Sequence, residues 1–277
     1  MSSYRDLVVH VDDGKSCAGR LEAAIELANR FEAHLTTVCV DPGLNVPVFV
    51  EAPVMPTLLE QLEADRAKRI ESVREQVAQI CDRAGIAAEW RLAEGELVST
   101  LNLHGRYSDL VILGQEGGGD EEEAVVGGLP DSLTLELGRP VLVIPYIGVR
   151  RPPGKRVLVA WNGSREAARA VHDAMPFLVA AEHVEVVYAN PREGQAGDLP
   201  GADISLHLAR HGVKASAEQV VAGDVDIGDL LLSRAADADA DLIVMGAYGH
   251  SRFREVVLGG VTRHLLRHMT VPVLMSH

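Results

Sequence analysis

Short runs rich in valine, isoleucine and leucine alternate with longer amphipathic stretches along the whole chain. In the amphipathic stretches apolar residues recur three or four positions apart, as at Leu21, Ile25 and Ala28, which is the spacing of one helix face. Continuous apolar runs between such helices are typical of a parallel sheet covered on both faces. With right-handed crossovers, the pattern predicts a doubly wound α/β fold.

The expected strands fall into two sets of five. They are Leu7–Val11, His34–Val40, Ala88–Leu92, Leu110–Leu113 and Val141–Ile144 in the first half, and Val157–Trp161, His183–Ala189, Ala215–Val221, Leu242–Met245 and Val271–Met275 in the second. One continuous helix is expected over Arg165–Phe177.

The two halves repeat each other at a constant offset of 132 residues. Asp109-Leu-Val-Ile-Leu-Gly recurs as Asp241-Leu-Ile-Val-Met-Gly, and Arg139-Pro-Val-Leu recurs as Val271-Pro-Val-Leu. A repeat of this length indicates one domain present twice. The proline- and glycine-rich stretch after Arg150 falls where the repeat restarts, so we expect domains at 1–149 and 150–277.

One segment has no counterpart in the second half. Pro42–Pro56 contains four prolines among apolar residues, which makes a regular strand there improbable. It is either a lid or docking loop, or an ordered loop packed on its own domain, and the latter is favoured.

Both halves carry the same glycine spacing after the fourth strand. The first has Gly114-x-x-Gly117 followed by Gly127-Gly128, and the second has Gly246-x-x-Gly249 followed by Gly259-Gly260. Glycine there indicates close approach of the backbone to a ligand. In the second half the turn and the helix opening at Gly260, with Val261 and Thr262, would offer backbone N–H groups and a hydroxyl to a polyphosphate, and His250, Ser251, Arg252 and Arg254 would add donors.

Asn162-Gly-Ser164 lies on the turn after the first strand of the second half, facing this loop. Asn162 could contact an adenine edge or a ribose hydroxyl, or Asn162 or Ser164 could simply cap the next helix. Gly223-Asp224 could likewise contact a ribose or form an ordinary turn. The spacing alone leaves these alternatives open.

The overall composition narrows the classes of partner. A net charge of −14 over 277 residues argues against general binding to nucleic acid or anionic membranes. No apolar run approaches the roughly 18 residues needed to span a bilayer, and the chain leads straight into a strand, which predicts a cytoplasmic protein. Cys17, Cys39 and Cys81 fit reduced structural thiols.

These residues resemble the universal stress protein family in its tandem two-domain form, over nearly the whole chain. Gly246-x-x-Gly249-x9-Gly259 resembles the ATP-binding signature of that family, and Val159-Ala-Trp-Asn-Gly-Ser164 is similar to its first-strand motif. The resemblance implies an adenine near Ala160 and Asn162 and a ribose and α-phosphate near Met245, Gly246 and Gly249. It also implies the outer phosphates of ATP, with or without Mg²⁺, near Gly259, Gly260, Val261 and Thr262. Pairing of the two fifth strands as an intramolecular pseudo-dimer, and a further homodimer, are implied as well.

Two positions depart from the family pattern. Gly260 replaces a serine or threonine that would contact phosphate or Mg²⁺, and Asn162 replaces an aspartate. In the first half Asp120–Glu123 would place about four negative charges beside a phosphate, so that site is expected to be degenerate.

No catalytic motif and no metal site is predicted. His264 and His268 are four apart on a helix, a spacing that can bind zinc, but no cysteine or carboxylate ligand lies nearby in the sequence. The first hypothesis is therefore a stress-response regulator that binds ATP or a related adenine nucleotide in its C-terminal domain and acts on an unknown protein partner. The alternatives are a nucleotide-independent interaction module and a weak Mg²⁺-dependent ATPase.

Overall fold

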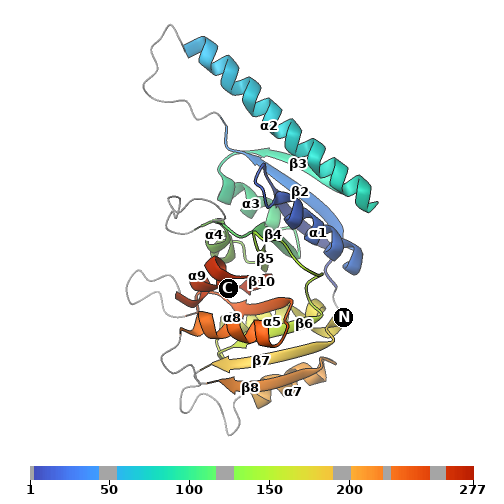
Figure 1. The fold of residues 1–277 in the computed structure, drawn as a ribbon, viewed down its shortest axis with the longest axis vertical. Coiled ribbons are helices and arrows are strands. Elements are labelled where there is room, and N and C mark those ends of the chain that lie inside the picture. Colours follow the sequence, from blue (N-terminus) through green and yellow to red (C-terminus); the bar gives the residue numbers. More distant parts are fainter. Residues whose placement is uncertain (1–2, 44–54, 117–127, 190–200, 221–225, 250–259) are drawn as a thin grey trace.

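The computed structural model describes residues 3–43, 55–116, 128–189, 201–220, 226–249 and 260–277. Its strands form one ten-stranded sheet in the order β3-β2-β1-β4-β5-β10-β9-β6-β7-β8, which runs through the whole molecule (Figure 1). Most of Pro42–Pro56 lies outside the described residues, whereas its last two residues open helix α2.

The described part of the first half contributes nine elements in the expected alternation. They are β1 (Asp6–Val11), α1 (Cys17–Phe31), β2 (His34–Asp41), α2 (Met55–Ala84), β3 (Ala88–Glu94), α3 (Leu97–Gly105), β4 (Leu110–Gly114), α4 (Leu129–Glu136) and β5 (Val141–Ile144). Residues 117–127, between β4 and α4, lie outside the described residues. The second half has β6 (Arg156–Trp161), α5 (Arg165–Asp173), α6 (Met175–Ala180), β7 (His183–Ala189), α7 (Ala202–Arg210), β8 (Ala215–Val220), α8 (Ile227–Asp237), β9 (Leu242–Gly246), α9 (Gly260–His268) and β10 (Val273–Ser276).

Within each half all neighbouring strands are parallel, and the halves join where β10 pairs antiparallel with β5, with Val273 opposite Val143. The expected α/β fold and the pairing of the two fifth strands are confirmed. Alternate strand residues point to opposite faces, so Leu7 and Val9 of β1 lie in one core layer and Val8 in the other. Helices α1, α2, α5, α6 and α7 cover the first layer, and α3, α4, α8 and α9 cover the second.

Two boundaries differ from expectation because of proline. The helix predicted as continuous over Arg165–Phe177 is two helices, since Pro176 cannot donate a backbone hydrogen bond and its ring would collide with the preceding turn. The last strand starts at Val273 rather than Val271 because Pro272 cannot join the hydrogen-bond ladder. The prediction of a single helix was wrong.

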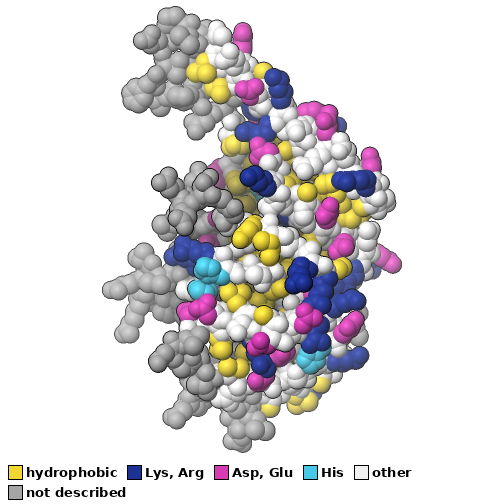
Figure 2. All heavy atoms as spheres, viewed as in Figure 1, with side chains coloured by type: hydrophobic (Ala, Val, Ile, Leu, Met, Phe, Trp, Pro, Cys, Tyr) yellow, Lys and Arg dark blue, Asp and Glu magenta, His cyan; other side chains and the backbone are white. Residues whose placement is uncertain are grey.

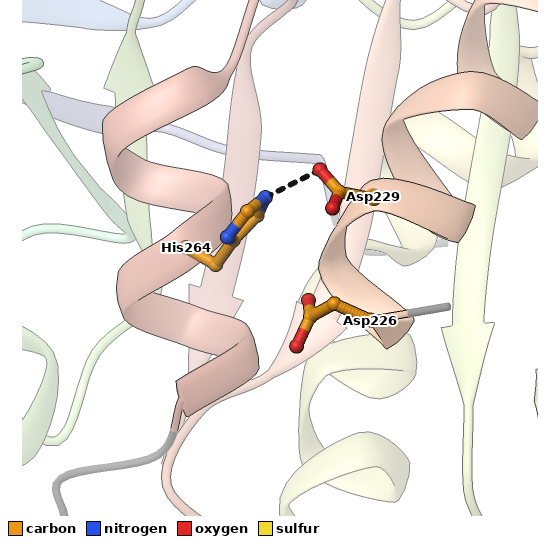
Figure 3. A group of neighbouring side chains, drawn as sticks. All are labelled: Asp226, Asp229 and His264. Atoms are coloured by element: carbon orange, nitrogen blue, oxygen red, sulfur yellow. Dashed lines mark hydrogen bonds and ion pairs between the residues drawn. The ribbon is translucent and has the colours of Figure 1, made fainter. Parts of the chain in front are cut away.

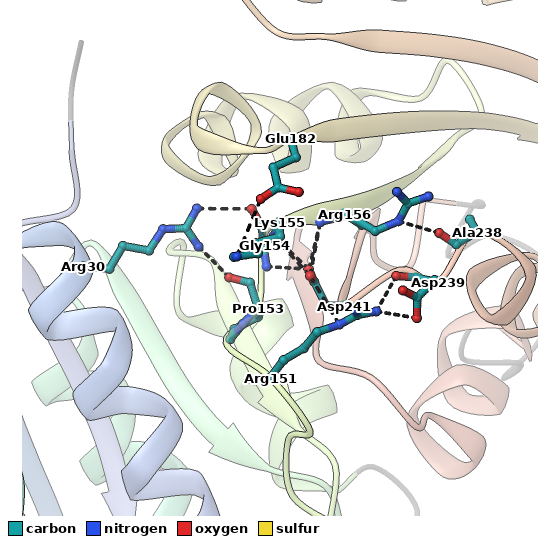
Figure 4. Close-up of polar contacts among 10 residues, drawn as sticks. All are labelled: Arg30, Arg151, Pro153, Gly154, Lys155, Arg156, Glu182, Ala238, Asp239 and Asp241. Atoms are coloured by element: carbon teal, nitrogen blue, oxygen red, sulfur yellow. Dashed lines mark hydrogen bonds and ion pairs between the residues drawn. The ribbon is translucent and has the colours of Figure 1, made fainter.

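The repeated aspartates directly precede the fourth strands, β4 and β9, and accept hydrogen bonds from the backbone at the starts of the first strands, β1 and β6. Asp109 accepts hydrogen bonds from the N–H groups of Arg5 and Asp6, at 2.7 and 3.1 Å. Asp241 accepts from the N–H groups of Gly154, Lys155 and Arg156, the first at 2.7 Å (Figure 4). The sequence repeat therefore preserves a carboxylate that satisfies the backbone where each half begins.

A polar and aromatic junction fastens the halves on one face. The Arg30 guanidinium, on α1, donates to the carbonyl oxygens of Pro153 and Gly154 at 2.7 and 3.1 Å (Figure 4). The rings of Phe31 and Phe177 meet edge-on with centroids 5.2 Å apart, and Tyr4 packs against both. Such edge-to-face pairs add to the burial of apolar area.

No helix among the described residues is both long and apolar enough to cross a membrane. Acidic and basic side chains are interspersed over the face shown in Figure 2, with apolar groups between them.

Candidate functional site

The strand order reverses between β6 and β9, and the candidate site lies at this point. The two strands are parallel, with Ala160 opposite Met245, and the chain leaves them towards opposite sides of the sheet. The N-termini of α5 and α9 open at the same carboxyl edge, because each helix runs back against the strands. This is the crevice in which doubly wound folds take ligands, and helix N-termini there favour anions.

Gly246 is required by the approach of α5 to the end of β9. A Cβ atom at this position would lie 2.5 Å from the carbonyl carbon of Glu166 and 2.9 Å from the Cα of Ala167. Both are backbone atoms of the first turn of α5. The sequence interpretation attributed this glycine to the approach of a ligand, whereas within the described structure the close neighbour is the helix itself.

Gly249 lies against a buried carboxylate that the sequence analysis did not single out. A Cβ here would lie 2.7 Å from Glu166 Oε2 and 3.3 Å from Ser164 Oγ. Glu166 is only 4% exposed and forms an ion pair with Arg165. Burial alone would raise the pKa of Glu166, but hydrogen bonds from Arg165, its own N–H and Ser164, with the charge of Arg165, hold that pKa below its usual value. Glu166 therefore stays ionised at neutral pH beside Gly249.

The turn after β6 shows which of its residues caps the next helix, α5. Ser164 is the N-cap of α5, with its hydroxyl oxygen accepting from the N–H of Ala167 at 3.1 Å. Asn162 is exposed, and its Oδ1 accepts from the N–H of Ser164 at 3.0 Å. Ser164 is thus a cap, while Asn162 braces the turn and stays accessible at the edge of the crevice.

The start of α9 offers backbone more than side chains. Gly260 is exposed, and no described heavy atom would lie within 4 Å of a Cβ built on it. Val261 is half-buried, and Thr262 is 3% exposed, so its hydroxyl lies inside rather than at the surface. Met245 is likewise buried, at 5%. His250, Arg252 and Gly259 lie outside the described residues, as do Gly223 and Asp224.

The corresponding place in the first half is filled by an internal cation. The guanidinium of Arg20 lies against Gly114, its Nε donates to the carbonyl oxygen of His10 at 2.7 Å, and its Nη2 is 2.9 Å from Asp12 Oδ2. Among the described residues this buried nitrogen has no hydrogen-bond partner, and its contact with Asp12 is an ion pair. A cavity of about 430 Å³ adjoins the cluster beneath α2.

His10 is neutral in this cluster. Burial is the main cause, and the charge of Arg20 adds to it, so the pKa of His10 falls to about 4 although Asp12 acts in the opposite direction. The acidic run Asp120–Glu123, on which the prediction of a degenerate first site rested, lies outside the described residues.

Each glycine loop contacts a helix of the other half across the junction. Tyr248, between Gly246 and Gly249, has a left-handed backbone with φ of 58° and donates its hydroxyl to Asp131 of α4. Gln115, directly after Gly114, donates to the carbonyl oxygens of Leu266 and Arg267 at 2.9 and 3.0 Å. Each loop is therefore hydrogen-bonded to the other half through one helix, α4 or α9.

Together the fold and the crevice define a tandem, doubly wound α/β protein. A profile of the universal stress protein family matches residues 154–277. Universal stress protein Slr1230 of Synechocystis is 28% identical over 171 residues, which are 60% of this chain and 57% of that protein. Universal stress protein Rv2005c of Mycobacterium tuberculosis is 26% identical over 185 residues, 61% and 62% of the two chains. The match spans less than two thirds of either relative.

Solved structures extend the likeness to the whole fold. A universal stress protein from Archaeoglobus fulgidus superposes with a TM-score of 0.77 at 18% identity, covering 98% of this chain and 95% of its own. A functionally unknown protein, PA1789, from Pseudomonas aeruginosa gives 0.58 at 15% identity, covering 99% and 92%. At these identities the structural likeness is one of fold. Residues 154–277 thus match the universal stress protein family, and the chain as a whole has the tandem fold of a solved universal stress protein.

Proposed function

We propose that the protein is a regulator that binds ATP or a related adenine nucleotide in the crevice between β6 and β9. The observation that carries this proposal is the convergence of two helix N-termini, those of α5 and α9, at the carboxyl ends of two adjacent parallel strands. The Gly246-x-x-Gly249-x9-Gly259 spacing, which resembles the ATP-binding signature of the family, supports the same assignment.

The charges in the crevice suggest how a nucleotide would lie. The ionised Glu166 beside Gly249 repels phosphate, whereas the open first turn of α9 at Gly260 presents N–H groups and the positive end of the helix dipole. The phosphates would therefore lie towards α9 and the base towards Ala160 and Asn162. Loss or gain of the nucleotide would act on Tyr248, and through it on the first half and on the surface offered to a protein partner.

A nucleotide-independent interaction module is the second candidate. It is favoured by Gly246, since the approach of α5 explains that glycine without any ligand. The same observation makes Gly246 unsuitable as a test of binding, because any side chain there would disturb the packing of α5 on β9.

Gly260 provides a cleaner test. Because the position is exposed and no described atom lies within 4 Å of a Cβ, Gly260→Glu should leave the fold intact, and a glutamate at a helix N-terminus is favourable. Its charge would nevertheless repel phosphate. Isothermal titration of the nucleotide-stripped chain with Mg·ATP should show about one site, weakened at least about tenfold in Gly260→Glu, an effect of roughly 1.4 kcal/mol.

Two further variants are expected to strengthen the binding of Mg·ATP. Gly260→Ser restores a hydroxyl at the position where the family signature has one, and Glu166→Gln removes the buried negative charge, so both should bind Mg·ATP more tightly than the unmodified chain. Absence of binding at millimolar Mg·ATP by the unmodified chain and by Gly260→Ser alike would reject the nucleotide proposal and favour the interaction module.

A further inference from the structure

Two carboxylates of α8 face one imidazole of α9 across a narrow gap (Figure 3). Asp226 is the N-cap of α8, Asp229 follows one turn later, and His264 lies on α9. One ligand atom from each of the three side chains lies within 4.8 Å of the other two. His264 is separated from both aspartates by more than 30 residues of sequence, so spacing along the chain could not reveal the group.

The packing of the helices sets this geometry. Leu231 of α8 and Leu265 of α9 are buried in the same core layer, which holds the two helices against each other. Between them Gly228 leaves room for the imidazole, because a Cβ there would lie 2.7 Å from His264 Cδ2 and 2.9 Å from Asp226 Oδ1. His264 is thereby held by tight packing against α8.

The hydrogen bonds already orient the donors. Asp226 Oδ1 accepts from the N–H of Gly228 at 2.7 Å, which fixes the carboxylate as a helix cap and leaves Oδ2 for a further partner. His264 Nε2 lies 2.7 Å from Asp229 Oδ1. A cation between the three groups would replace this contact between Nε2 and Asp229.

The chemistry of the donors selects the kind of cation. Magnesium and calcium prefer sets made of oxygen alone, whereas one imidazole nitrogen with two carboxylate oxygens suits zinc and its neighbours in the first transition series. Three protein ligands also leave a position for water or another ligand. Two carboxylates close together in a chain of net charge −14 would be stabilised by a divalent ion.

We propose that Asp226, Asp229 and His264 form a binding site for a divalent transition-metal ion of the zinc class. The site stands independently of the proposed nucleotide function. His264 is four residues from Gly260, which is about 6 Å along the axis of α9, so a bound ion would lie near the same edge of the sheet as the crevice.

The test uses the full chain without an affinity tag, freed of metal with a chelator and studied in the absence of nucleotide. Titration with Zn²⁺ by calorimetry, and with Co²⁺ followed by its visible absorption, should show one equivalent of each ion at this site. We expect His264→Ala and Asp229→Asn each to weaken Zn²⁺ binding at least about tenfold, since each removes a direct ligand.

His268→Ala is the matched control. Its imidazole lies one turn further along α9, with the ring centroid 4.5 Å from that of His264, but it is not part of the three-residue group. This variant should retain the Zn²⁺ affinity within about twofold, and circular dichroism should show that all variants are folded. Zn²⁺ binding that is unchanged in His264→Ala, or lost equally in His268→Ala, would overturn the assignment, and so would the absence of Zn²⁺ binding at micromolar concentrations.

Discussion

The two halves differ in what packs against the glycine at the end of the fourth strand, where the first and fourth strands lie side by side. In the first half Arg20 reaches across and lies over Gly114, tied to His10 and Asp12. In the second half the backbone of α5 itself closes on Gly246, and the buried charge is the carboxylate of Glu166. Among the described residues, side chains occupy the first crevice, whereas helix packing shapes the second and places no atom within 4 Å of a Cβ at Gly260 of α9. A repeated sequence has thus kept the fold while the interiors of the two crevices diverged.

The largest difference between the two halves is expected in the free energy of unfolding when one methyl group is added at Gly246 or at Gly114. In Gly246→Ala the Cβ would meet backbone atoms of Glu166 and Ala167, which can move only if α5 shifts, so we expect a loss of about 3 kcal/mol in the free energy of unfolding. In Gly114→Ala the nearest atom is the end of the Arg20 side chain, which can reorient, so the loss should be about 1 kcal/mol. Urea denaturation followed by circular dichroism measures both. Equal losses would show that the two crevices are packed alike.

The second difference concerns pH. His10 is buried with a pKa of about 4, well below its ordinary value near 6.5, and the corresponding position of the second half is Ala160. Between these two values the unfolded chain binds a proton that the folded chain does not, so stability falls as the pH is lowered from 6.5 towards 4. From pH 7 to pH 5 this contribution should amount to roughly 2 kcal/mol.

The measurement is the free energy of unfolding of the unmodified chain and of His10→Gln at several pH values between 7 and 5. Other groups titrate in both proteins, so the informative quantity is the difference in slope. The variant should lose stability less steeply than the unmodified chain. Parallel curves would mean that His10 takes up its proton over the same pH range in the folded and the unfolded chain, and that the Arg20 cluster is not arranged as described.

Much of the fold follows from the sequence because it depends on periodicity that repeats. Apolar runs gave the strands to within two residues at their ends, and the repeat anchored by Asp109 and Asp241 indicated two similar halves joined through their fifth strands. The apolar spacing of Arg165–Phe177 is continuous, and periodicity alone does not show that Pro176 divides this segment into two helices.

The packing inside the site depends on distances between separate helices and strands, and these distances cannot be read from the sequence. Nothing in the spacing of Gly246 distinguishes a neighbouring helix from a ligand, since glycine meets either need. Glu166 looked like an ordinary acidic residue in a first helical turn, which is a favourable and common position. Arg20 and the group of Asp226, Asp229 and His264 come together only through the packing of separate elements.

The smallest expected effect tests the contact that joins the two crevices. Tyr248 donates its hydroxyl to Asp131, a residue that is 9% exposed and whose carboxyl pKa is raised above its usual value mainly by burial. Tyr248→Phe removes the donor and leaves Asp131 Oδ1 without this partner, so the free energy of unfolding should fall by about 1 kcal/mol. Tyr107→Phe is the matched control, because Tyr107 is 81% exposed and should give no measurable change.

If Mg·ATP binds as proposed, Tyr248→Phe should also reduce the protection from hydrogen exchange that the nucleotide confers on α4. Undiminished protection of α4 in this variant would mean that the halves communicate by another contact, of which Gln115 with the carboxyl end of α9 is the nearest.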